Sequence, residues 1–244
     1  QLFNAVKEND ASLVDRLIRQ GADVNSRDTN QATVLMWAMY KADLQLVKAL
    51  VLAGADSKSK GVIYLDSLQQ GYYGNLTGIA AGEGDLEKLK YLLETLKTPV
   101  NDRELNPKNG EEDGWTAIQW AWSKKSESLL SYLKKIGANL AQDTRQQVLA
   151  AENEFGRNSV EFQAAVFTLG QILNDYEKDY EKAVEWFKRA AEQGYAKADY
   201  QLGKLYHDSL GVIANEIESA KYYQSAAEGG YGRAQYRLGR LYLD

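Results

Sequence analysis

A single histidine and the absence of cysteine limit the chemistry open to this chain of 244 residues. Thiolate nucleophiles, disulfides and zinc sites rich in Cys or His are excluded, and a Ser-His-Asp triad is the one remaining option that uses histidine. His207 follows Tyr206 near the end of an expected helix and belongs to no recognisable constellation. We therefore interpret His207 as a residue at a helix end or on the surface, and we predict no catalytic residue.

Acidic residues and glycine pairs suggest two other kinds of site. The run from Asn174 to Glu181 places acids at alternate positions, as a calcium-binding loop does, but Tyr180 and Trp186 stand where such a loop needs glycine and an acid. We interpret the run as a solvated turn between helices. The glycine pairs at 71–74 and 82–84 lack the Lys-Ser/Thr of a phosphate-binding loop. The sequence thus predicts no metal and no cofactor, and it leaves a carboxylate-based, metal-dependent enzyme as a remote alternative.

Composition and charge narrow the classes of partner. The 29 basic and 34 acidic residues give a net charge of -5 without a basic run, which argues against nucleic acid. No stretch approaches the roughly 20 apolar residues of a membrane span, so we expect no membrane insertion. The chain starts inside a helical pattern without Met, and we expect that its natural start is missing. The compartment, cytoplasm or periplasm, stays open.

The stretch from Gln31 to Asp56 reads as two short apolar helices closed by Gly-Ala-Asp. A helix pair this short cannot bury its apolar face alone, so it needs a similar pair on each side. Two prolines and scarce strand-like alternation indicate that the rest of the chain is also helical. We therefore predict an all-α fold in which helix pairs stack into an α-solenoid.

The first half repeats this plan. Gly-Ala-Asp at 21–23 recurs 33 residues later at 54–56, and Gly-Ala-Asn follows at 137–139. The pattern resembles the ankyrin repeat, whose period is about 33. Thr33, Asn75 and Thr116 are predicted to cap the inner helices, and each Gly to end an outer helix. The His of the ankyrin signature is missing, so we expect the side-chain network that braces adjacent hairpins to be absent.

Two insertions depart from this period. One falls within Ser57 to Asn75 and contains Tyr72 and Tyr73, and the other is a polar excursion from Asn106 to Gly114. Long insertions in a repeat lie on one edge, where loops that recognise a partner are usually found. The acids of the second insertion, Glu111, Glu112 and Asp113, suggest a basic patch on the partner.

The second half has a different repeat. Ala-x-x-x-Leu-Gly occurs at 165–170, 198–203 and 234–239, and aromatic residues followed by Ala-Ala-Glu lie between these copies. The pattern resembles the Sel1-like repeat, a relative of the tetratricopeptide repeat. Gly costs about 1 kcal/mol in a helix, so we expect Gly170, Gly203 and Gly239 to mark places where aromatics of the second helix pack closely. The last copy is half a repeat, and we expect a further helix or a partner beside it.

The two resemblances give a domain division. We predict an ankyrin-repeat domain at residues 1–140, a linking helix at 141–155 and a Sel1-like repeat domain at 156–244. Within the first domain, Trp120 aligns with Trp37 and is expected in the core. For Trp122 two positions stay open, one in the core and one on the surface facing a partner. Partner contacts are predicted on the inner-helix face and the long hairpins, from Tyr40, Lys41, Tyr72, Tyr73, Glu111, Glu112, Asp113, Trp122, Tyr206 and His207.

Both resemblances imply protein binding and neither implies catalysis. Their combination resembles bacterial proteins, which include immunity proteins that neutralise toxic effectors of secretion systems, phospholipases among them. We therefore expect a non-enzymatic interaction scaffold, most concretely an immunity protein whose partner is a toxin effector. An adaptor or chaperone, or a bacterial effector directed at a host protein, uses the same surface and is the alternative.

Overall fold

The computed structural model describes residues 1–64, 72–104 and 114–241. The chain divides into two compact units, Gln1–Asn139 and Leu140–Asp244. Both are built from helices, and the strands β1 (Ile63–Tyr64) and β2 (Tyr72–Tyr73) are the only ones in the described residues. The prediction of an all-α repeat fold is confirmed. The predicted limits of the domains and of the linking helix stay predictions.

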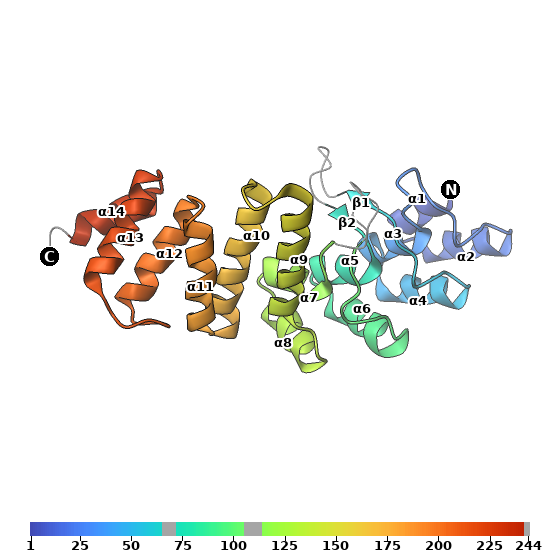
Figure 1. Cartoon of the computed structure of the whole chain (residues 1–244). Coiled ribbons are helices and arrows are strands. Elements are labelled where there is room, and N and C mark those ends of the chain that lie inside the picture. Colours follow the sequence, from blue (N-terminus) through green and yellow to red (C-terminus); the bar gives the residue numbers. More distant parts are fainter. Residues whose placement is uncertain (65–71, 105–113, 242–244) are drawn as a thin grey trace. The chain divides into compact units, whose positions relative to one another are not determined.

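The first unit consists of helix pairs that pack in sequence order (Figure 1). Its inner helices are α1 (Leu2–Lys7), α3 (Val34–Lys41), α5 (Leu76–Gly82) and α7 (Ala117–Ser123). The outer helices are α2 (Ala11–Arg19), α4 (Leu44–Leu52), α6 (Leu86–Lys90) with a π-helical continuation (Tyr91–Thr95), and α8 (Glu127–Lys135). Successive inner helices contact one another, and each inner helix contacts its own outer helix. The stack buries the apolar face that a single pair leaves open.

The helix ends of the first unit follow the sequence signals. The side chain of Thr33 accepts from the amide of Met36, and that of Asn75 accepts from Gly78. Thr116 forms a capping box with Gln119. The glycines that follow α2, α4 and α8 have φ near +95°, a backbone conformation that favours glycine: Gly21, Gly54 and Gly137. The predicted caps are thus confirmed.

The expectation that adjacent hairpins lack a side-chain brace is wrong. Asn25 donates from Nδ2 to the carbonyl of Gly54 at 3.1 Å and accepts from the amide of Asp56 at 2.8 Å. One hairpin further, Lys60 Nζ pairs with Asp102 Oδ1 at 3.0 Å. Other polar residues therefore connect the hairpins in place of the missing histidine.

The second unit starts with α9 (Leu140–Phe155), which packs against α10 (Val160–Gln171). A π-helical segment (Ile172–Glu177) continues α10, and α11 (Tyr180–Ala191), α12 (Ala196–His207), α13 (Glu216–Glu228) and α14 (Gly232–Leu241) follow, each against its predecessor. The acidic run at 174–181 therefore begins inside a helix, and its turn is confined to Lys178, at φ 60°, and Asp179. The interpretation of the whole run as a turn was wrong, because the helix continues with a wider turn through Glu177.

Candidate protein-binding surface

Five aromatic side chains of the first unit form a continuous series of ring contacts, which we call the aromatic row. The ring centroids of Trp37 and Tyr40, both on α3, lie 6.1 Å apart, and Tyr40 lies 5.9 Å from Tyr73 of β2. Tyr73 lies 4.9 Å from Trp120 of α7, which in turn lies 4.9 Å from Trp115. Such pairs contribute roughly 0.5–1.5 kcal/mol each beyond their burial, so the row connects three successive repeats.

Two lysines lie over the rings at one end of the row. Lys7 Nζ lies 3.7 Å from the centroid of the Trp37 ring, and Lys41 Nζ lies 3.9 Å from that of Tyr40. Both lysines are exposed, and neither forms an ion pair within the described residues. Cation–π contacts at exposed sites contribute only about 0.5–1 kcal/mol. The ammonium groups are therefore positioned on the rings yet still open to a carboxylate.

Tyr73 lies in the interior and not on the surface, where we expected it. Its side chain is completely buried, and its ring packs so closely on α5 that a Cβ at Gly82 would lie 2.2 Å from a ring carbon. The hydroxyl donates to Glu83 at 2.6 Å. Burial raises the pKa of this phenol well above its usual value, so it stays neutral. The β1–β2 pairing turns Tyr73 inward, and it therefore holds the row together.

Glu104 is a buried carboxyl group that the sequence did not single out. Its side chain is 1% exposed, and Oε1 accepts from the amide of Gly74 at 3.0 Å. Burial raises its pKa to about 8. Glu104 precedes the second insertion, and its backbone pairs with the far end of that insertion: its amide donates to the carbonyl of Trp115 and its carbonyl accepts from the amide of Gly114. Glu104 thus links the ends of both insertions beneath the row.

Of the other residues predicted for the first unit, two lie at the aromatic row. Tyr40 is half-buried within the row and Lys41 is exposed beside it. Trp122 is half-buried, as are Trp37 and Trp120, so the expectation of a core position for Trp120 holds only in part. The backbone of Tyr72 belongs to β2. Glu111, Glu112 and Asp113 lie outside the described residues.

Tyr206 and His207 lie in the second unit, at the end of α12. The ring of Tyr206 stacks on that of Tyr222 at 5.4 Å, and Lys188 Nζ lies 5.8 Å from the Tyr206 centroid. A hydrogen bond with Tyr206 raises the pKa of Lys188. His207 is the last residue of α12 and is exposed. This cluster is a second, smaller group of aromatic and cationic side chains.

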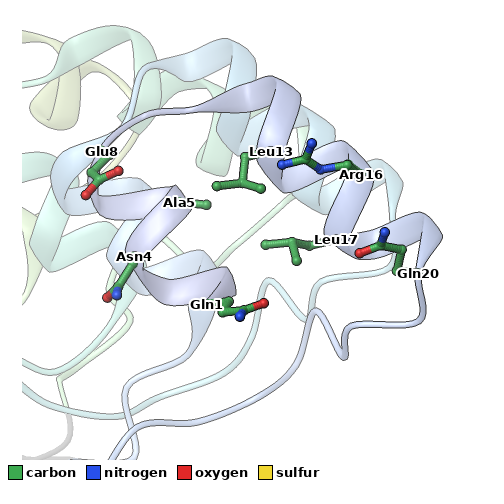
Figure 2. Close-up of a pocket in the computed structure, with 8 residues that line it drawn as sticks. All are labelled: Gln1, Asn4, Ala5, Glu8, Leu13, Arg16, Leu17 and Gln20. Atoms are coloured by element: carbon green, nitrogen blue, oxygen red, sulfur yellow. The ribbon is translucent and has the colours of Figure 1, made fainter.

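A groove and the acidic side chains are other candidate sites among the described residues. A groove of about 520 Å³ lies between α1 and α2, with Leu13 and Leu17 inside it and Glu8 and Arg16 along its rim (Figure 2). Within the described ranges, His, Asp and Glu side chains nowhere gather in threes in a way that could hold a metal ion. In the same ranges, every helix is too short or too polar to cross a bilayer.

Comparisons with known proteins assign the repeats. A model of ankyrin repeats matches residues 2–72, and a model of the Sel1 repeat matches 167–195, 196–231 and 232–244. Residues of this chain are also 34% identical, over 93 positions, to the ankyrin repeat domain-containing protein SAT10 of Stachybotrys chartarum. That match spans 38% of this chain and 4% of the fungal protein. The chain is therefore a repeat protein in which ankyrin repeats at 2–72 precede Sel1 repeats at 167–244.

Proposed function

We propose that the chain is a non-enzymatic scaffold that binds a protein partner through the aromatic row and the two lysines beside it. The observation that carries this proposal is the position of Lys7 and Lys41, whose ammonium groups lie on exposed faces of Trp37 and Tyr40 and form no ion pair in the described part of the chain. Trp and Tyr are among the side chains that most often dominate protein interfaces, and the faces of their rings attract cations.

The row also suggests what the partner segment contains. A carboxylate placed at Lys7 or at Lys41 gains a charge-assisted contact, while an apolar side chain packs on the half-buried rings. The nearby acids compete little for these lysines. Asp28 accepts from the indole of Trp37 and from backbone amides, and Glu83 accepts from Tyr73. We therefore expect a partner segment with acidic and apolar residues.

More specifically, we propose that the chain is a bacterial immunity protein that binds and neutralises a toxin effector of a secretion system. A phospholipase is one candidate for this toxin. The combination of ankyrin and Sel1 repeats supports this role, because it resembles that of such immunity proteins. Non-enzymatic binding is sufficient for the role, since covering the active site of a toxin needs a complementary surface and no chemistry.

The proposed immunity role is tested with the toxin that is encoded beside the gene of this chain. We expect the two purified proteins to elute as one stoichiometric complex, and co-expression to restore growth to cells that produce the toxin. Failure to bind and to protect against every neighbouring toxin would remove the immunity role. A complex with a host protein, or with a protein that the chain helps to fold, would favour the effector or the chaperone role.

A further inference from the structure

A pocket of about 160 Å³ lies between the first two Sel1 repeats of the second unit. One wall comes from the π-helical end of α10 and the start of α11, with Asn174, Lys178 and Tyr180. The other wall comes from α12 and the residues that follow it. At roughly 30 Å³ per water molecule, the pocket has the volume of about five waters. It therefore suits a small organic molecule and not a segment of folded protein.

Close packing holds the helices around the pocket in place. A Cβ at Gly170 on α10 would lie 2.7 Å from a ring carbon of Phe187 on α11, and a Cβ at Gly203 on α12 would lie 2.7 Å from a ring carbon of Tyr223 on α13. These two glycines thus let aromatic rings approach the helix backbones, as expected from the sequence. At Gly239, no described atom lies within 4 Å of such a Cβ.

Apolar contact inside the pocket comes from Leu205 and Leu210. Leu205 is 3% exposed, and its carbonyl accepts from the amide of Leu210 at 3.0 Å. The next residue, Gly211, packs so closely on the backbone of Tyr180 that a Cβ there would lie 2.4 Å from the carbonyl carbon. The loop that carries Leu210 is therefore fixed against the opposite wall, and the apolar part of the pocket has a defined shape.

Three charged side chains line the same pocket, Lys178, Lys204 and Asp208. None of them forms an ion pair with a described residue. Lys204 and Asp208 stand four residues apart at the end of α12, a spacing at which opposite charges often pair, yet no ion pair joins them. Both charges are thus open to a ligand. Two cations and one acid in so small a space fit a molecule that carries both a carboxylate and an ammonium group.

Asn174 adds an acceptor whose partner is missing. Its Nδ2 donates to Asp175, whereas its Oδ1 is buried and has no hydrogen-bond partner among the described atoms. Such an oxygen costs roughly 1–3 kcal/mol unless a donor reaches it, and an N–H group of a ligand would be such a donor. Asn174 also lies in the π-helical segment, and π-helical turns are frequent at functional sites.

We propose that this pocket binds a free α-amino acid with an apolar side chain of the size of leucine. The carboxylate of the amino acid contacts Lys178 and Lys204, its ammonium group contacts Asp208, and its side chain packs on Leu205 and Leu210. A phosphate or a dicarboxylate fits less well, because Asp208 repels a second negative charge. The site is separate from the aromatic row of the first unit and does not depend on the role proposed for that row.

The test is isothermal titration calorimetry of the full chain with L-leucine, for which we expect saturable binding of one molecule per chain. Two analogues each remove one charge of the ligand. Leucinamide lacks the carboxylate and N-acetyl-leucine lacks the ammonium group, and each should bind at least tenfold more weakly than leucine. Absence of saturable binding by leucine, or equal binding by either analogue, would overturn the proposal.

Variants of α12 locate the site. K204Q and D208N each remove one charge from the pocket and should weaken the binding of leucine at least tenfold. The control K197Q changes an exposed lysine of the same helix that does not line the pocket, and it should bind leucine as the wild type does. Because none of these three side chains is buried, their melting curves in circular dichroism should match that of the wild type. Equal affinity of the wild type and D208N for leucine would place the ligand elsewhere and refute the assignment.

Discussion

Replacing Glu104 by Gln tests how the two insertions of the first unit are held. The carboxyl group is buried beneath the aromatic row, where Oε1 accepts from Gly74. Gln keeps an acceptor oxygen at this position and cannot ionise. The variant therefore preserves the shape and the main hydrogen bond of the site while it removes the charge that the wild type acquires at high pH.

The size of the pH effect on stability follows from the difference between the pKa of Glu104 in the folded chain and its pKa in the unfolded chain. Burial raises the pKa of Glu104 in the folded chain to about 8, from an ordinary value of 4.5. Between these values the unfolded chain binds fewer protons, so the free energy of unfolding falls as pH rises. At about 1.4 kcal/mol per pH unit, the loss of unfolding free energy between pH 4.5 and 7 is about 3 kcal/mol. The loss of unfolding free energy levels off above pH 8, where Glu104 is ionised in both states.

The assay is urea unfolding of the wild type and of E104Q at several pH values between 5 and 8.5. Trp fluorescence follows the first unit, because four of the five tryptophans lie there, at positions 37, 115, 120 and 122. Other titrating groups are shared by both proteins, so their effects cancel in the difference. We expect the stability of E104Q relative to the wild type to rise by about 1 kcal/mol per pH unit up to pH 8. A difference that stays constant over this range would refute the reasoning.

Three further substitutions test the packing and the caps. Gly203→Ala should lower the melting temperature in circular dichroism, by an overpacking cost of about 1–3 kcal/mol, because its Cβ would lie 2.7 Å from the Tyr223 ring; an unchanged melt would argue against this close packing. Lys88→Met should cost about 1–3 kcal/mol in urea unfolding, because the buried Nζ donates to the carbonyl of Met39 at 2.9 Å, and a neutral effect would show that this bond is dispensable. Thr116→Ala should cost about 1 kcal/mol by the same measurement through loss of the capping box, whereas Thr116→Ser should cost little.

Local signals with a short range were sufficient to predict the architecture. The spacing of Gly-Ala-Asp, the caps at Thr33 and Asn75, and the mid-helix glycines at 170 and 203 each reflect a backbone requirement that a few neighbouring residues satisfy. Repeats add to this, because the same requirement recurs at a fixed step. The exception is the acidic run at 174–181, where a π-helical continuation of α10 carries residues that the sequence placed in a turn.

The aromatic row was harder to predict, because its members come from different repeats and from an insertion. Tyr73 was expected outside with its hairpin, yet the pairing of Ile63 with Tyr73 directs the ring onto Gly82. Glu104 gave no signal, since a lone acid in a polar connector is normally solvated. The small residues of helix α5 could have indicated both positions. Gly78 leaves room for the side chain of Glu104, and Gly82 leaves room for the ring of Tyr73.

One affinity comparison tests most directly whether the first unit binds a protein through the lysines on its aromatic row. The dissociation constant for the neighbouring toxin is measured for the wild type, for the double variant Lys7→Glu and Lys41→Glu, and for the control Lys135→Glu on the outer helix α8. We predict that the double variant binds at least tenfold more weakly, a loss of about 1.4 kcal/mol, and that the control binds as the wild type does. Equal affinities for all three proteins would contradict the claim.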